Sequence, residues 1–168
     1  TWSGPDQWDF GQMDERAHII LSAEPNGLIM PRIYIGTPQW WWERHPEEMI
    51  VLDHGGAVYQ DPHNDVFNMK RPYACIASPK RRADMGEALR KTIEHMQQSD
   101  YAQHIFGYEI AALGSEEWYH MTVNQLQLGD YNPNMQAAFR KWLREKYQTD
   151  HSLQVSWRKP EITFAQVT

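Results

Sequence analysis

Apolar residues recur at helical spacing in two stretches of the first part of the chain. They mark one face of residues 11–23 and one face of residues 79–98, and both stretches therefore predict amphipathic helices. Ser78 and Pro79 open the second stretch, and a serine N-cap followed by proline is typical of a helix start.

Each of these helices leads into a run of β-branched and apolar residues. Residues 28–35 and residues 105–113 predict strands. Pro31 interrupts the first of them, and because proline has no backbone N–H it fits only where the strand ladder needs no donor. A helix followed by a strand, repeated, is the pattern of a parallel sheet with crossover helices. The predicted fold class is therefore α/β.

The remaining segments predict loops and two further helices. Residues 1–10 are rich in turn formers and aromatic residues and predict a loop, and a second loop is expected to hold Trp40, Trp41 and Trp42. Residues 43–73 are irregular, and a loop of this length in a compact domain is typically functional or disordered. Asn132 and Asp150 are expected to cap the two C-terminal helices.

Length and charge exclude several classes of protein. With 168 residues the chain is expected to be a single domain or a fragment of something longer, and it is shorter than the roughly 200 to 250 residues of a closed eight-stranded barrel. A net charge of −6, with scattered basic residues, argues against a nucleic-acid partner. No apolar run approaches the ~18 residues of a membrane-spanning helix, so no membrane partner is expected.

The aromatic content suggests a carbohydrate ligand. Eight Trp and eight Tyr occur in a chain whose mean hydropathy is −0.72. Sugar-binding clefts use this mixture, because pyranose C–H faces stack on rings while hydroxyl groups bind polar side chains. Many of these rings serve equally well as core residues.

A pair of carboxylates follows the second predicted strand. Glu116 and Glu117 come just after residues 105–113 and directly before Trp118. A carboxylate just past the carboxyl end of a buried strand, beside an aromatic ring, is where an α/β enzyme can hold a general acid. Glu117 is the preferred candidate because it adjoins the ring, and Glu116 is the alternative.

Five motifs occur in an order that resembles a known enzyme family. They are Trp8-Asp9-Phe10; Gly36-Thr37-Pro38 with Trp41-Trp42 and His45-Pro46-Glu47; Arg71-Pro72-Tyr73 with Cys75 and Ser78-Pro79; Gly107-Tyr108 through Glu117-Trp118; and Phe139 to Tyr147 with Leu153 and Trp157. Their order over nearly the whole chain resembles the catalytic barrel of glycoside hydrolase family 42, the β-galactosidase family, or of a close relative in the same clan.

The resemblance implies a fold, a reaction and a set of site residues. The fold would be a partial (β/α)8 TIM-barrel segment, early-to-middle strands only, with parallel strands, crossover helices and a long aromatic loop. The complete protein would hydrolyse terminal β-glycosides with retention, with Glu117 or Glu116 as acid/base. Substrate binding would fall to Arg71, Trp40, Trp41, Trp42 and Trp118.

The resemblance also leaves parts of the family's machinery without a counterpart. The nucleophile of the family is a second glutamate on a later strand, and no such residue is found in the chain, so the isolated chain is expected to be inactive. The family's cysteine-rich zinc cluster cannot form from the single cysteine, Cys75. No cofactor is implied, and the localisation stays open.

Three other interpretations are weighed against this one. A non-catalytic carbohydrate-binding or self-assembling module would keep the aromatic loop, and an unpaired sheet edge would favour self-association or pairing with a complementing barrel segment. A metal site is disfavoured, because the donors in the long loop match no recognised ligand spacing; they are Asp53, His54, Asp61, His63 and Asp65. A serine hydrolase is disfavoured because the sequence contains no Gly-x-Ser-x-Gly elbow, and a cysteine hydrolase because nothing in the sequence around Cys75 supports a nucleophile.

Overall fold

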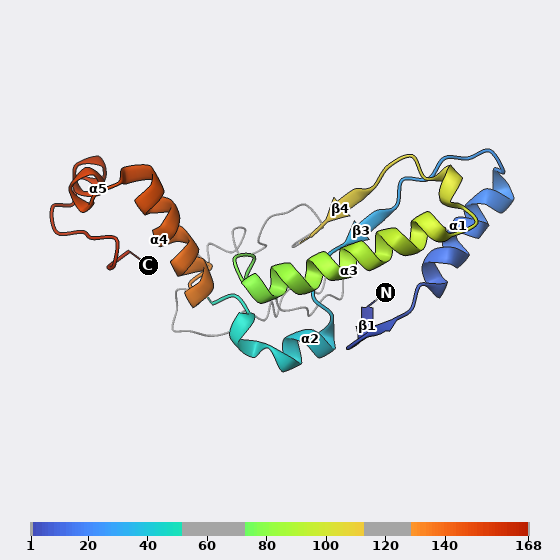
Figure 1. The fold of residues 1–168 in the computed structure, drawn as a ribbon, viewed down its shortest axis with the longest axis horizontal. Helices are drawn as coiled ribbons and strands as arrows, with labels where there is room; N and C mark the ends of the chain where they lie inside the picture. The colour runs from blue at the N-terminus through green and yellow to red at the C-terminus, as the bar shows by residue number, and fades with distance from the viewer. Residues whose placement is uncertain (1, 52–72, 113–128, 168) are drawn as a thin grey trace. The chain divides into compact units, whose positions relative to one another are not determined.

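The computed structural model describes residues 2–51, 73–112 and 129–167 (Figure 1). The elements in chain order are β1 (Trp2–Gly4), β2 (Gln7–Trp8), α1 (Gly11–Ala23), β3 (Arg32–Tyr34), α2 (Gln39–Arg44), the 3-10 helix η1 (Pro46–Glu48), α3 (Pro79–Gln98), the 3-10 helix η3 (Ala102–His104), β4 (Glu109–Ala111), α4 (Pro133–Tyr147) and α5 (Asp150–Trp157). The chain divides into two compact units, residues 1–44 with 83–121 and residues 45–82 with 122–168.

The centre of the first unit is a parallel pair of strands. β3 and β4 pair in the register Arg32 to Glu109, Ile33 to Ile110 and Tyr34 to Ala111. The parallel arrangement confirms the α/β prediction, but both strands are shorter than expected. Pro31 has no N–H to donate, although its carbonyl accepts from the Glu109 N–H over 3.0 Å. Before Pro31, the described pairing continues as an isolated bridge between Ile29 and Ile105.

Two helices cover one face of this pair. α1 and α3 have the predicted bounds, and Figure 1 shows both alongside β3 and β4. The buried centre of their contact consists of Ala17, Ile33, Met96 and Tyr101. Partly buried apolar residues surround it: Met13, Leu21, Ile29, Ile35, Leu89, Ile93, Ile105, Tyr108 and Ile110. The apolar stripes that predicted the helices are therefore the faces that pack on the sheet.

The N-terminal segment is a hairpin, so the prediction of a loop over residues 1–10 was wrong. β1 and β2 pair antiparallel, and Trp2 lies opposite Trp8. The turn between them includes Asp6 with a φ of 54°, a conformation that aspartate tolerates better than most residues. Strands of two and three residues are too short for alternation to reveal them.

The tryptophan trio lies on a helix, so the predicted loop there was also wrong. α2 begins after Pro38, whose carbonyl accepts from the Trp41 and Trp42 N–H groups over 3.0 and 3.3 Å. The Gln39 side chain also donates to Glu43 over 2.8 Å, one turn along the helix. Six residues give too short a pattern for helical periodicity to be recognised.

The C-terminal helices form the core of the second unit. α4 and α5 pack around Leu143, Leu153, Phe164 and Val167, all of them buried. The predicted cap of α5 was displaced by one residue: the Thr149 hydroxyl accepts from the Ser152 N–H, whereas Asp150 is the first helical residue and its carboxylate accepts from the Phe164 N–H over 2.8 Å. Both arrangements use a short polar side chain to satisfy a free backbone donor.

Asn132 is a buried polar residue that joins α4 to η1 and to the residue directly after it. Its Oδ1 atom accepts from the Asn134 N–H over 2.9 Å, which confirms the predicted N-cap. Its Nδ2 atom donates to the carbonyls of Glu47 and Met49, both over 2.8 Å. One side chain with 1% exposure thus satisfies three backbone groups of the second unit.

Among the described residues, no helix combines the length and the apolar character that a membrane crossing needs.

Asn132→Ala is expected to destabilise the second unit strongly. The substitution removes the cap and leaves the carbonyls of Glu47 and Met49 without their donor, which together cost about 2 to 4 kcal/mol. Urea unfolding followed by tryptophan fluorescence measures this loss. Asn132→Asp keeps the cap acceptor and loses the donor, so its free energy of unfolding should lie between those of the natural chain and Asn132→Ala. Gln98→Ala, at an exposed amide, should change the free energy of unfolding little.

Candidate active site

The carboxyl ends of β3 and β4 lie at the same edge of the sheet. Because the strands run parallel, Tyr34 and Ala111 are opposite each other, and the Ile35 N–H donates to the Ala111 carbonyl over 2.9 Å. The chain continues from β3 into α2 and from β4 into residues 113–128. In open and closed parallel sheets, ligands bind beside this edge.

The turn between β3 and α2 requires glycine at position 36. A Cβ atom there would lie 2.0 Å from Cε1 of Tyr34, so any side chain would collide with the ring. Absence of a side chain lets the backbone pass directly over Tyr34.

The three tryptophans of α2 have different surroundings. Trp41 is fully buried, and its Nε1–H donates to the Asp84 carboxylate on α3 over 2.7 Å. Trp40 and Trp42 are both half-buried. Trp41, which the resemblance assigned to substrate binding, therefore anchors the helix instead, and of the three only Trp40 and Trp42 retain ring surface that a sugar could stack on.

Trp40 belongs to a row of aromatic contacts that runs into the N-terminal hairpin. The Trp2 ring meets it edge-on with centroids 4.5 Å apart, and the guanidinium carbon of Arg44 lies 5.8 Å from its ring centre. The row continues through Trp8 and Phe10, whose rings stack at 5.7 and 6.1 Å. Such offset and edge-on pairs hold rings in fixed orientations.

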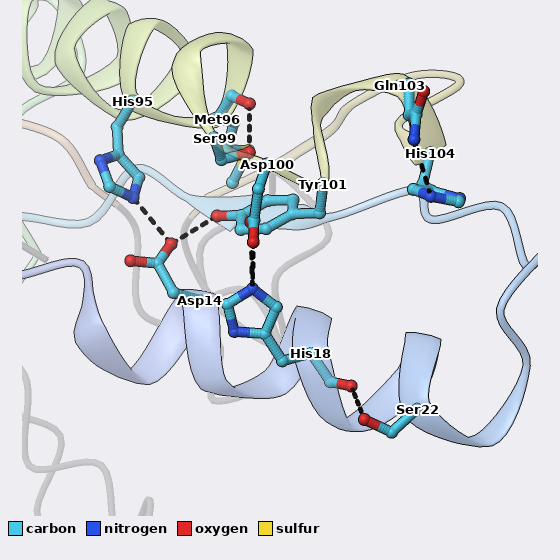
Figure 2. Close-up of polar contacts among 10 residues, drawn as sticks. All are labelled: Asp14, His18, Ser22, His95, Met96, Ser99, Asp100, Tyr101, Gln103 and His104. Atoms are coloured by element: carbon cyan, nitrogen blue, oxygen red, sulfur yellow. Dashed lines mark hydrogen bonds and ion pairs between the residues drawn. The ribbon is translucent and has the colours of Figure 1, made fainter.

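A polar cluster joins the helices on the covered face of the sheet (Figure 2). Asp14 on α1 accepts from the Tyr101 hydroxyl over 2.5 Å, and the same oxygen is 2.7 Å from Nε2 of His95 on α3. Phe10 stacks on the His95 ring with centroids 4.2 Å apart. His95 lies in the last turn of α3 and Tyr101 just after it, so this cluster ties α1 to the end of α3.

The same contacts shift the pKa values of the cluster. Burial raises the pKa of Tyr101 to about 12, and the hydrogen bond to Asp14 and its negative charge act in the same direction. Burial also tends to raise the pKa of Asp14, but the hydrogen bonds from Tyr101 and His95 outweigh it and hold the pKa below the ordinary 3.8. The folded state therefore favours ionised Asp14 beside neutral Tyr101.

Cys75 is a structural residue of the second unit. It is fully buried, and burial raises the pKa of its thiol to about 12, with a further increase from the neighbouring carboxylate of Asp130. A nucleophilic cysteine needs a lowered pKa and access to solvent. This environment agrees with the absence of sequence support for a cysteine hydrolase.

Comparison with known proteins assigns the chain to a family. A sequence model of glycoside hydrolase family 42, described as beta-galactosidase, matches residues 4–160. The chain belongs to this family. The resemblance in the order of the motifs is thereby confirmed.

Related β-galactosidase sequences match nearly the whole chain but are far longer. Beta-galactosidase BgaA of a Thermus species is 28% identical over 156 residues, which cover 91% of this chain and 21% of that protein. Beta-galactosidase LacZ of Lactobacillus acidophilus is 24% identical over 151 residues, covering 90% of this chain and 19% of that protein. The chain thus spans about a fifth of the length of these relatives.

Solved structures show the same fold. The beta-galactosidase of the psychrophilic Marinomonas ef1 superposes with a TM-score of 0.69 at 20% identity, over 98% of this chain and 23% of that one. The beta-galactosidase of Bacillus circulans sp. alkalophilus superposes with a TM-score of 0.67 at 17% identity, over 94% of this chain and 20% of that one. The mixed helix and strand arrangement is therefore one that β-galactosidases share.

Several predicted site residues of this family 42 chain lie outside the described residues. They are Glu116, Glu117, Trp118 and Arg71, together with the loop donors Asp53, His54, Asp61, His63 and Asp65. In the part of the chain that the structure describes, no group of three or more His, Cys, Asp or Glu side chains could hold a metal ion. The described share of the predicted site is the tryptophan trio.

Sequence reasoning missed two residues that shape this edge. Asp84 is separated from Trp41 by 43 positions, and no local motif connects an aspartate in a helix to a distant indole. Trp2 was assigned to a loop, although its position opposite Trp8 in a hairpin would have suggested an aromatic cross-strand pair.

Asp14→Asn is expected to flatten the acid side of the stability profile. Because the folded state lowers the pKa of Asp14, its contribution is complete above 3.8 and is lost as the pH falls through the lowered value. The free energy of unfolding, measured with urea, should fall between about pH 6 and about pH 2.5. This fall should be smaller in the variant than in the natural chain, by an amount on the order of 1 kcal/mol.

Asp100→Asn is the matched control for this experiment. Its carboxylate also pairs with a histidine, His18, at 3.0 Å, but the side chain of Asp100 is 77% exposed. Exposed pairs contribute little, so this variant should retain the natural decline. An equal flattening in both variants would contradict the role given to Asp14.

Proposed function

We propose that the protein carrying this chain is a retaining β-galactosidase in which Glu117 is the acid/base. The observation that supports this most is the family match over residues 4–160, because it spans β3, α2, β4 and the segment after β4 in one alignment. In the sequence Glu117 comes six positions after Ala111, the last residue of β4. General acids of parallel α/β enzymes occupy this place.

The sugar would contact several rings and a guanidinium group. Trp40 and Trp42 on α2 and Trp118 after β4 supply ring faces for the pyranose C–H groups. Arg71 supplies a planar fork of donors for hydroxyl groups or for orienting a carboxylate. Trp41 takes the role of anchor, because its ring is buried.

The reaction proposed is a double displacement. Glu117 gives its proton to the glycosidic oxygen as the bond to the anomeric carbon breaks, while an ionised carboxylate roughly 5 to 5.5 Å away attacks that carbon. Glu117 then removes a proton from water, which attacks the glycosyl-enzyme and releases the sugar. The attacking carboxylate would come from a later strand of the complete protein.

We propose further that the two units are a segment of a (β/α)8 barrel. The face of β3 and β4 opposite the helices carries the ion pair of Arg32 and Glu109, 2.9 Å apart. Just before these strands in the chain, the side chains of Leu28, Met30 and Phe106 are 66%, 50% and 63% exposed. Such apolar exposure is typical of a surface that further elements cover, here the remaining barrel strands.

Glu117→Gln is expected to lower hydrolysis of β-galactosides at least about 100-fold in the complete protein. Loss of the acid should affect a substrate with a poor leaving group more than an aryl galactoside with a good one, since the latter needs little protonation. Added azide should restore turnover of the aryl substrate by replacing the water that Glu117 activates. Steady-state rates on both substrates measure these effects.

Glu116→Gln is the matched control, since it removes the adjacent carboxylate. It should retain most of the activity. If instead Glu116→Gln loses activity and azide restores it, while Glu117→Gln stays active, the acid/base role belongs to Glu116. If the unsubstituted complete protein binds galactosides yet hydrolyses none, the non-catalytic carbohydrate-binding module becomes the better account.

The isolated chain is expected to self-associate through its uncovered apolar face. Leu28→Ser combined with Phe106→Ser should shift the chain towards the monomer, because it removes two of the exposed apolar side chains there. Sedimentation velocity over a range of concentrations measures the change. Val155→Ser, at a 65% exposed residue of α5, is the control, and an equal shift in it would argue against this face.

A further inference from the structure

We infer that Asp84 is a positioning residue for sugar binding, acting through α2. The inference rests on the proposed function, since it concerns the same sugar site. The link is the hydrogen bond of 2.7 Å from Nε1 of Trp41 to the Asp84 carboxylate. Asp84 touches no sugar in this account; its effect reaches the ligand through the orientation of Trp40 and Trp42.

The bond is of a kind that fixes a side chain firmly. Trp41 has 0% exposure with Asp84 in place, so in the intact fold the carboxylate is the acceptor that its indole N–H meets. A buried indole N–H without an acceptor loses its full hydrogen-bonding free energy, and a charged acceptor makes the bond stronger than a neutral one. Trp41 therefore has a strong preference for the one orientation in which it meets Asp84.

The helix itself cannot supply this orientation. α2 has six residues, and a helix of so few residues is not stable by its own backbone bonds. Its position depends on its side chains, and Trp41 is the one that is completely buried. Since Trp40 and Trp42 flank Trp41 on the same short helix, a displacement of Trp41 moves both of their rings.

A second contact holds the same helix from another side. Trp2 meets Trp40 edge-on at 4.5 Å, while Nε1 of Trp40 is buried without a hydrogen-bond partner. The orientation of Trp40 thus depends on ring packing and on the Arg44 guanidinium beside its ring, contacts that are less directional than the hydrogen bond of Trp41. Asp84 is consequently the more exacting of the two restraints on α2.

The test uses Asp84→Ala and Asp84→Asn in the complete protein, with an aryl β-galactoside as substrate. Asp84→Ala should raise KM about tenfold and change kcat little, because a lost stacking contact acts on substrate and transition state alike. Asp84→Asn should restore most of the affinity, since its amide oxygen still accepts from the indole N–H. A purely structural role would lower thermal stability without this division between KM and kcat.

A direct readout of the bond comes from the indole N–H signals in NMR spectra of the chain. The Trp41 signal should move in Asp84→Ala and return towards its original position in Asp84→Asn. Glu94→Ala removes an exposed carboxylate from α3, the helix that also carries Asp84, and is the matched control. It should leave the signal, KM and kcat unchanged.

The outcomes separate this inference from the proposed function. If the unsubstituted protein hydrolyses the galactoside and Asp84→Ala has the natural KM at a temperature where it is folded, the positioning role is wrong and the enzyme remains. If the unsubstituted protein neither binds nor hydrolyses galactosides, the proposed function is wrong and the inference is lost with it. A tenfold rise in KM that Asp84→Asn does not reverse also contradicts the inference, because the acceptor oxygen would then not be the cause.

Discussion

The parallel pairing of β3 and β4 is the constraint on which the first unit depends. Its register places Tyr34 opposite Ala111, so two segments that are distant in sequence leave the sheet side by side. α1 and α3 can cover one face only because both strands present isoleucines there. Everything proposed for the carboxyl edge follows from this pairing, since an antiparallel arrangement would send the two continuing segments to opposite ends.

Specialisation within α2 illustrates how one short sequence can serve two purposes. Three consecutive tryptophans cannot all point the same way on a helix, because neighbours are about 100° apart around its axis. Trp41 is committed to the interior, where it meets Asp84, and its neighbours are left half-buried. Stacking surfaces for a sugar are more effective when the element that carries them is anchored independently of the ligand.

Long periodic elements were predictable from the sequence, and short ones were not. α1 and α3 have the expected bounds because their apolar stripes extend over several turns, and Asn132 was recognisable as a cap from its place before a proline. The hairpin of β1 and β2 and the helix α2 contain too few residues to show a period. In the candidate site, the sequence assigned all three tryptophans of α2 to substrate binding, and it could not single out Trp41 as the buried anchor because its partner Asp84 is joined to it only by tertiary contact.

The burial of Cys75 also bears on the surroundings that the protein tolerates. A thiol whose pKa is about 12 is almost never ionised at physiological pH, and it lies beneath the surface. Oxidants and disulfide partners react with exposed thiolates. Cys75 is therefore protected from oxidation in the folded second unit, and a cysteine introduced elsewhere on the surface could be labelled selectively without first removing the native one.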